Sequence, residues 1–272
     1  MFNPLKKPAR VGILGCGTIG TYVAKFLDSD ELPAILAGVC DRDPERAESL
    51  ITHLKNTVHI YDINKLVHYS DLIVECASAQ AVDEIVILCC EHQKHLVVLS
   101  IGGLRTEHLE RAARSRISLT IPSGAIGGLD AIQAHADAGI EELTLTTRKP
   151  PAAYRQVEWV IKQGIDVDDI KGETVLFEGS ADSAVERFPQ NVNVAGTLKI
   201  VSGDFSGLRV RVIADPHVHY NLHEIYVRSR IGAATTRFEN LPSPENPKTS
   251  ALACHSAVAT LRKMLSNVKK GT

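Results

Sequence analysis

The length and composition of the chain are those of a folded protein with one large or two modest domains: it has 272 residues, of which 44% are hydrophobic and 23% are charged. The formal net charge is −2 and the Lys and Arg residues are scattered, so no basic stripe is available to bind a nucleic-acid backbone. No apolar run reaches the roughly 18 residues of a membrane span, and glycines interrupt the apolar stretch that a secretory signal would need. We therefore expect neither nucleic acid nor a membrane as a partner.

Strands and helices alternate at the start of the sequence. Ala9–Leu14 is a short apolar strand, a glycine-rich loop follows it, and Thr18–Leu27 has the composition of a helix. Ala34–Cys40 is a second apolar strand. Asp43 and Pro44 then begin a helix, the first as N-cap and the second at the first helical position, where its missing N–H has no cost. This order predicts a βαβ unit.

The same alternation continues along the first half of the chain. Residues 72–76 and 95–100 are predicted strands, and residues 81–90 and 106–114 are predicted helices. Apolar strands separated by helices indicate a parallel sheet that helices cover on both faces, which is a Rossmann-like, doubly wound α/β fold. We expect this dinucleotide-binding domain to occupy residues 1–139.

The pattern changes beyond this point. The predicted strands are longer, and several alternate polar with apolar residues, which indicates an antiparallel sheet with one solvated face. We expect a second, α+β domain over residues 140–240, with a mostly antiparallel sheet. Residues 241–272 contain a proline-rich turn and a final helix over 249–265, which we expect to pack on the first domain. In this half, the predicted strands are residues 141–147, 174–178, 208–214 and 222–230. The other predicted helices are residues 152–161, 183–188 and 193–201.

The sequence GCGTIG after the first predicted strand has the GxGxxG spacing of a dinucleotide-binding loop. Gly15 permits the tight turn, Gly17 has no Cβ in the way of a pyrophosphate, and Gly20 lets helix and strand pack closely. Thr18 and Ile19 begin the helix, whose N-terminal N–H groups and partial positive charge favour phosphate. Because the loop joins a strand to a helix inside a βαβ unit, it predicts a site for a nicotinamide dinucleotide.

An acidic residue lies where the ribose of such a cofactor is bound. Asp41 ends the second predicted strand about 20 residues after the glycine loop, and it is expected to accept hydrogen bonds from both ribose hydroxyls of NAD and to repel a 2′-phosphate. The neighbouring Arg42 could instead accommodate NADP, so both cofactors stay open. Ser78 follows the third predicted strand, at the edge where ligands of such sheets collect, and is expected to contact the cofactor. FAD and S-adenosylmethionine proteins share part of this pattern.

The cysteines form no metal-binding or disulfide pattern. None of the six belongs to a CxxC pair or has the spacing of zinc ligands. They are expected to be small buried residues in a reducing compartment, which predicts a cytoplasmic protein. The six are Cys16, Cys40, Cys76, Cys89, Cys90 and Cys254.

Three segments of the second half carry motifs of one enzyme family: PSGAIGGLD at residues 122–130, FPQNVNVA at 188–195, and DP at 215–216 followed by NLHE at 221–224. Together with the glycine loop and TRKPP from residue 147, they cover most of the chain. On these motifs the sequence resembles the L-aspartate dehydrogenase family. The resemblance implies oxidation of L-aspartate with NAD or NADP to iminoaspartate, which hydrolyses to oxaloacetate and ammonia or feeds NAD biosynthesis, and also the reverse amination.

The resemblance also implies roles for individual residues. His223 matches the catalytic histidine, and histidine is the side chain that exchanges protons near neutral pH, as amine oxidation requires. Ala125 or Gly127, and Asn191 or Asn193, match positions that contact the cofactor. The sequence alone leaves open which residue of each pair corresponds.

A dicarboxylate substrate needs cations or N–H donors for its two carboxylates. Arg148 and Lys149, at the end of a predicted strand, are the expected cationic pair. Ser123 and Gly124 belong to a loop before a predicted helix, and its backbone N–H groups could bind the other carboxylate. Asn221, in the third motif, is a further expected substrate contact.

The sequence also contains a candidate metal-binding pair of histidines. His217 and His219 form an HxH pair close to His223, but no acidic or cysteine cluster accompanies them, and we expect no metal.

Two other function classes are alternatives to this family. A different two-domain NAD(P)-dependent enzyme, of the homoserine dehydrogenase or dihydrodipicolinate reductase kind, would show other substrate-domain motifs. A non-catalytic dinucleotide-binding regulator would not need His223. A homodimer is the expected assembly because it is the commonest one.

Overall fold

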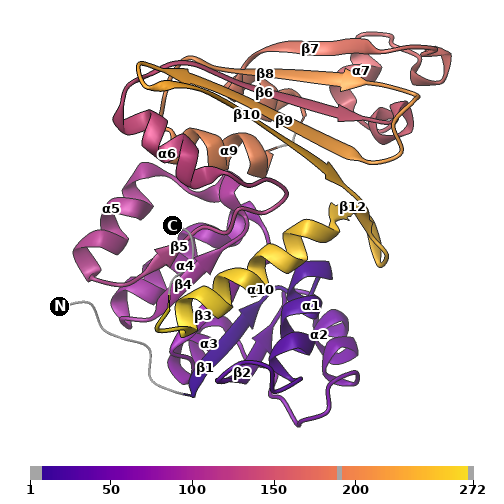
Figure 1. Cartoon of the computed structure of the whole chain (residues 1–272). Helices are drawn as coiled ribbons and strands as arrows, with labels where there is room; N and C mark the ends of the chain where they lie inside the picture. Colours follow the sequence, from indigo (N-terminus) through magenta and orange to yellow (C-terminus); the bar gives the residue numbers. More distant parts are fainter. Residues whose placement is uncertain (1–7, 189–191, 269–272) are drawn as a thin grey trace. The chain divides into compact units, whose positions relative to one another are not determined.

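The computed structural model describes residues 8–188 and 192–268. The described chain forms two compact units (Figure 1): the first unit contains residues 8–122 and 254–268, and the second unit contains residues 123–253 without 189–191. In the part of the chain that the structure describes, no helix is long and apolar enough to cross a membrane.

The first unit contains a five-stranded sheet in the order β2-β1-β3-β4-β5, with every pair parallel. Beyond β2, a single parallel bridge joins Val39 to Ile60, where one more edge strand would continue the Rossmann order. The strand order reverses between β1 and β3, and ligands of open α/β sheets bind at the carboxyl ends of strands at such a point. The strands are β1 (Ala9–Leu14), β2 (Ala34–Cys40), β3 (Leu72–Glu75), β4 (His95–Val98) and β5 (Leu119–Thr120).

Apolar side chains explain this arrangement. All four residues of β3 and of β4 are buried, which is typical of parallel strands covered on both faces. Asp43 caps α2 by accepting a hydrogen bond from the N–H of Glu45, and Pro44 is its first residue, as predicted. The helices are α1 (Thr18–Leu27), α2 (Pro44–Ile51), α3 (Ile63–Tyr69), α4 (Ala79–Glu91), α5 (Thr106–Ser115) and α10 (Ala251–Leu265). The last of these joins the core of this unit through Ala257, Val258, Leu261 and Leu265. The predicted Rossmann-like fold is confirmed.

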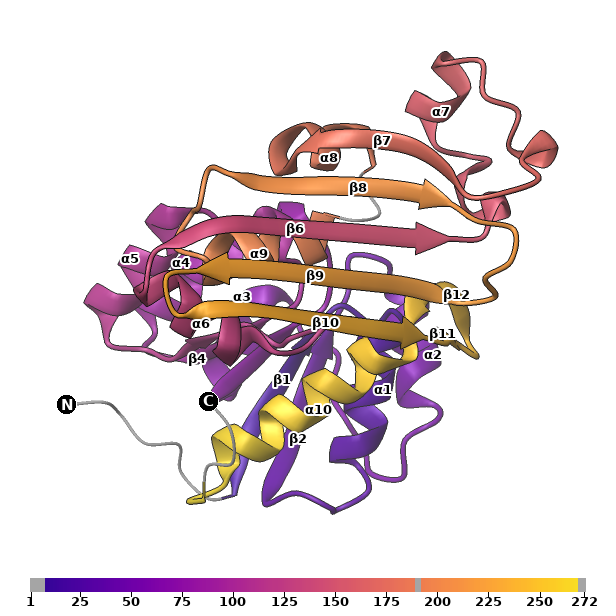
Figure 2. The same cartoon turned by 45° about the horizontal axis from the view of Figure 1, so that its top comes forward.

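The second unit contains a five-stranded sheet in the order β10-β9-β6-β8-β7 (Figure 2). Strands β6 and β8 are parallel and the other neighbours are antiparallel, so the predicted mostly antiparallel sheet is confirmed. A two-stranded sheet of β11 (Pro242–Ser243) and β12 (Asn246–Ser250) follows. The five long strands are β6 (Ile140–Lys149), β7 (Thr174–Ser180), β8 (Leu208–Ala214), β9 (Asn221–Ser229) and β10 (Gly232–Asn240).

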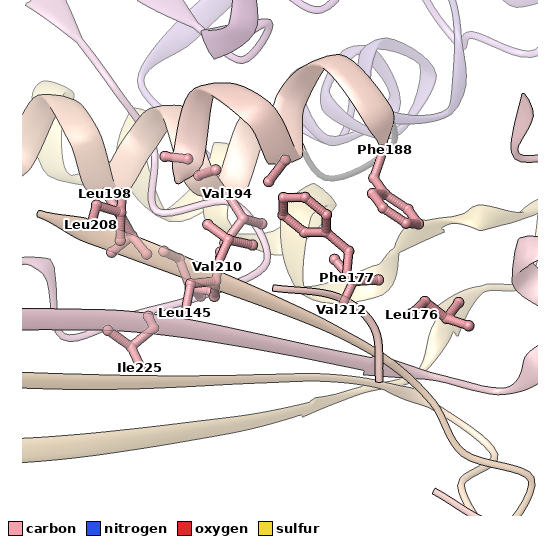
Figure 3. Close-up of a cluster of buried hydrophobic side chains, with 14 of the residues drawn as sticks. Leu145, Leu176, Phe177, Phe188, Val194, Leu198, Leu208, Val210, Val212 and Ile225 are labelled. Carbon is pink, nitrogen blue, oxygen red and sulfur yellow. The ribbon is translucent and has the colours of Figure 1, made fainter. Parts of the chain in front are cut away.

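Helices cover one face of this sheet, which we call its inner face. Side chains alternate along β6, so that Leu143 and Leu145 point into the core while their neighbours do not. Val194 and Leu198 of α9 pack toward β6 and β8 of this sheet (Figure 3). The helices of this unit are α6 (Leu129–Asp137), α7 (Glu158–Lys162), α8 (Ala181–Arg187) and α9 (Val192–Val201).

The division of the chain differs from the predicted domain boundaries at 139 and 240. Residues 123–139 lie in the second unit because α6 packs on β6 and β9, where Ile132 is part of the core. Residues 241–253 also lie in the second unit, and only the part of α10 from Cys254 belongs to the first. The sequence did not show this because an amphipathic helix does not indicate which sheet it will cover.

Several elements were also misplaced or missed. The predicted helix over 152–161 is a 3-10 turn at Pro151–Tyr154 and a separate α7, because Val157 between them has extended backbone. The predicted start of the last helix at residue 249 is the end of β12. β10 was missed because an edge strand of sequence GAATTRFEN has few apolar residues, and it forms only by pairing with β9.

Candidate functional site

In the first unit, the glycine loop leaves β1 at the point where the strand order reverses. Gly15 has a φ of +99°, a conformation that L side chains rarely adopt, and a Cβ there would lie 2.6 Å from the backbone of Cys76 and Ala77. A Cβ on Gly20 would lie 1.9 Å from the carbonyl oxygen of Gly15. These two glycines are therefore required by the fold of the loop itself.

Gly17 differs from both, because a Cβ there would have no atom within 4 Å. It is the N-cap of α1, and no side chain caps this helix end. Thr18 and Ile19 in the first turn are half-buried. The loop thus presents a helix N-terminus with open space in front of it, which fits the pyrophosphate of a dinucleotide.

Asp41 is bonded to the glycine loop. One carboxylate oxygen accepts the N–H of Cys16 at 2.6 Å, and the other accepts the N–H of Asp43 at 2.9 Å. Each oxygen keeps a second lone pair for a ribose hydroxyl. Arg42 beside it is exposed, and Ser78 is the half-buried N-cap of α4.

We expect Asp41→Ala to shift the cofactor preference toward NADP by about tenfold or more, because it removes the charge that repels a 2′-phosphate. The values of kcat/KM with NAD and with NADP measure this shift. Asp41→Asn is the matched control, since its amide oxygen still accepts a backbone N–H without the charge. If Asp41→Asn keeps the wild-type preference and Asp41→Ala loses activity with both cofactors, the carboxylate only holds the loop.

The sequence interpretation missed Glu75, a fully buried carboxylate at the end of β3. Its oxygens accept the N–H of Ala77 at 2.8 Å, and the N–H and hydroxyl of Ser100 at 3.0 and 2.7 Å. Burial raises the pKa of Glu75. The side chain joins the loops that follow β3 and β4, and an acidic residue inside an apolar strand was the signal that could have identified it.

In the second unit, the inner face of the sheet carries three polar side chains close to one another. His223 on β9 lies directly opposite Thr147 on β6, and Lys149 follows two residues later on the same face. All three are buried, with exposed fractions of 4%, 0% and 8%. The Nδ1 atom of His223 is 3.1 Å from the hydroxyl of Thr147.

Burial sets the charges of these groups. Burial, and then the positive charge of Lys149, lowers the pKa of His223 from 6.5 to about 3. Burial lowers the pKa of Lys149 from 10.5 to about 8. At neutral pH the face therefore presents a neutral imidazole beside an ammonium group.

The loop of residues 123–128 lies next to these strands. Asn240, which pairs with Asn221 across β9 and β10, donates a hydrogen bond from its side chain to the carbonyl oxygen of Ala125 at 2.7 Å. Gly127 lies against Phe238, the residue directly opposite His223 on β10. The tertiary structure thus brings the first and third sequence motifs together on one side of the sheet.

Arg148 and Lys149 do not form a pair. Arg148 points to the outer face because it alternates with Lys149, and its guanidinium is bonded to Asp215 at 3.0 Å and to Glu173. Burial by itself would lower the pKa of Arg148, but the hydrogen bonds and charges of these two carboxylates together outweigh it and raise the pKa. Lys149 is the cation that lies on the face of His223.

The remaining predicted residues are distributed as follows. Ser123 and Gly124 are half-buried in the loop, and Asn193 is exposed in the first turn of α9. Asn191 lies outside the described residues. His217 and His219 are exposed, and within residues 8–188 and 192–268 no three His, Cys, Asp or Glu side chains are grouped to hold a metal ion.

Comparison with known proteins assigns the chain to a family. The family model described as "Aspartate dehydrogenase, C-terminal" matches residues 130–264, and the one described as "Homoserine dehydrogenase, NAD binding domain" matches residues 15–117. The chain is 43% identical to the L-aspartate dehydrogenase of Methanosarcina acetivorans, over 97% of this chain and 99% of that protein. It is 34% identical to the one from Nitrosopumilus maritimus, over 95% and 97%.

The chain belongs to the L-aspartate dehydrogenase family. A crystal structure of aspartate dehydrogenase from Thermotoga maritima agrees, with a TM-score of 0.73 and 27% identity over 97% of this chain and 99% of that chain. A homoserine dehydrogenase from Thiobacillus denitrificans has a TM-score of 0.61 at 15% identity, over 97% and 74%, which shows a shared fold alone. The resemblance inferred from the sequence motifs is confirmed, and this family member is an NAD(P)-dependent dehydrogenase.

Proposed function

We propose that the protein catalyses the NAD(P)-dependent oxidation of L-aspartate to iminoaspartate, which hydrolyses to oxaloacetate and ammonia or feeds NAD biosynthesis, and also the reverse amination. The observation that carries this proposal is the buried ammonium of Lys149 on the same sheet face as the buried imidazole of His223. A cation in a buried site favours an anionic ligand, and a neutral imidazole accepts a proton. A substrate with carboxylates and an amine fits both groups.

The chain's own residues have separate tasks in this proposal. His223 takes one proton from the substrate ammonium, which leaves a lone pair on the nitrogen. That lone pair forms the C=N bond as a hydride leaves C2, so the amine loses one proton and one hydride. NAD or NADP, when bound, accepts the hydride. Lys149, with the N–H groups of residues 123–128, holds the carboxylates, and their negative charge raises the pKa of His223 in the complex.

The direct test of this function is a substrate comparison. Purified protein with NAD or NADP is expected to reduce the cofactor rapidly with L-aspartate and far more slowly with L-alanine, which leaves the carboxylate-binding groups unpaired. Absorbance of the reduced cofactor measures the rate. Turnover of L-homoserine with none of L-aspartate contradicts the proposal.

We expect Lys149→Met to raise the KM for L-aspartate by roughly 100-fold, because it removes the cation on the face of His223. Arg148→Met is the matched control on the same strand, since its side chain lies on the outer face in ion pairs. Steady-state kinetics on both variants decide which of the two predicted cations binds substrate. A larger effect from Arg148→Met assigns this role to the arginine.

The same lysine is expected to make dicarboxylate binding depend on pH. Because the pKa of Lys149 is about 8, its charged form is present below pH 8 and is lost as the pH rises. Succinate has no amine to titrate, so its inhibition constant is expected to rise above pH 8 in the wild type and to show no such step in Lys149→Met.

Lys149 is also expected to make the stability of the fold depend on pH. Burial lowers its pKa from 10.5 to about 8, so between these pH values the unfolded chain binds more protons and the wild-type protein gains stability as the pH rises. The Tm of the wild type should therefore rise relative to that of Lys149→Met between pH 8 and pH 10. A difference in Tm between the two proteins that stays constant over this range contradicts this.

A cytoplasmic location and a homodimer are also proposed. All six cysteines are free in the structure, which supports a reducing compartment. A symmetric dimer is the commonest assembly of such chains. Light scattering on the purified protein tests the dimer, which a monomer mass at working concentration would exclude.

A further inference from the structure

Thr147 is a polar residue in direct contact with the imidazole of His223. The two residues lie directly opposite each other on β6 and β9, although they are 76 positions apart in the sequence. Their side chains are 3.1 Å apart between Oγ1 and Nδ1, and both residues are buried. Paired strands hold both backbones, so the geometry of this hydrogen bond is built into the sheet.

We propose that Thr147 is a positioning residue whose hydroxyl oxygen accepts the Nδ1 proton of His223, which leaves the lone pair of Nε2 to take the proton from the substrate. The role in catalysis rests on the function proposed above. The hydrogen bond itself is a property of the second unit alone.

The accepting role follows from what a base at this position must do. A neutral imidazole carries one proton, and the hydrogen bond at one nitrogen decides whether the other is a donor or an acceptor. If the hydroxyl donated to Nδ1, the proton would sit on Nε2 and that atom could not accept another. With the hydroxyl as acceptor, Nδ1 donates to Thr147 both before and after Nε2 takes up a proton, so nothing has to rearrange.

A neutral partner also suits the electrostatics of this face. A carboxylate at the same position would favour the imidazolium ion, as the aspartate of a catalytic triad does. A hydroxyl orients the ring without adding charge, and Lys149 on the same face disfavours protonation. His223 is thereby kept neutral until an anionic substrate binds.

The test compares three variants on one strand. Thr147→Val keeps the shape of the side chain and removes the hydroxyl, Thr147→Ser keeps the hydroxyl, and Thr146→Val makes the same change on the outer face. For Thr147→Val we expect kcat with L-aspartate to fall roughly 10–100-fold, with KM and cofactor affinity within about twofold of wild type. Thr147→Ser should recover most of kcat, and Thr146→Val should match wild type.

The second readout is nitrogen-15 NMR of histidine-labelled protein without substrate. His223→Gln assigns the signal among the 11 histidines of the chain. The wild type should show a proton on Nδ1, and Thr147→Val should lose this preference. A proton on Nε2 in the wild type, or a wild-type kcat in Thr147→Val, overturns the proposal. If the wild type does not oxidise L-aspartate, the proposed function fails, while the NMR measurement still decides whether Thr147 accepts the proton.

Discussion

His223→Ala is expected to lower kcat for L-aspartate by roughly 10²–10⁴-fold while leaving cofactor affinity unchanged, the loss typical of a missing general base. The imidazole is buried on the inner face of the second sheet, beside Thr147 and Lys149. The imidazole takes a proton from the substrate and is not expected to contact the dinucleotide, so its removal should not alter cofactor binding. Steady-state kinetics with saturating cofactor measure the first effect, and cofactor titration measures the second.

Two companion variants sharpen this test. His223→Gln fills more of the buried volume than alanine, so it separates the lost base from a cavity. His219→Ala removes an exposed histidine from the same stretch of chain and should retain wild-type kcat. Near wild-type turnover by both His223 variants would exclude a catalytic role, and an equal loss in His219→Ala would indicate general damage to this segment.

Gly17→Val is expected to weaken dinucleotide binding on the order of 100-fold, or about 2.7 kcal/mol, because its side chain would occupy the space in front of the N-terminus of α1. The fold should tolerate it. The φ of Gly17 is −75°, and a Cβ there would meet no atom within 4 Å, so the loss of stability should not exceed about 1 kcal/mol. Cofactor titration and thermal unfolding of the same sample measure both effects.

Gly20→Ala is the contrasting control in the same loop. Its Cβ would lie 1.9 Å from the carbonyl oxygen of Gly15, so this smaller substitution should destabilise the first unit strongly. If Gly17→Val binds NAD and NADP as tightly as the wild type, the loop does not hold the phosphates. If Gly20→Ala has a wild-type Tm, the close packing of helix and strand is not required.

Local signals were enough to predict the elements around the glycine loop of the first unit. The glycine loop, the N-cap at Asp43 and the apolar runs of β1 and β2 each depend on residues close in sequence, and these elements have the predicted bounds. The family was also predicted from short motifs, because each motif is a run of neighbouring residues that can be read directly from the sequence. The bounds of β8 were likewise predicted from its own residues.

Tertiary structure decided which side chains meet. Arg148 and Lys149 are adjacent in sequence, but strand alternation places them on opposite faces, so the predicted pair is divided. Thr147 contacts His223 only because β6 pairs with β9 in one register, and a shift of one residue would separate them. The unit to which α6 belongs was equally undetermined, since its apolar face fits any sheet of suitable shape. Motifs thus predicted the chemistry of this chain, whereas contacts between distant strands decided its geometry, because register and packing depend on residues far apart in sequence.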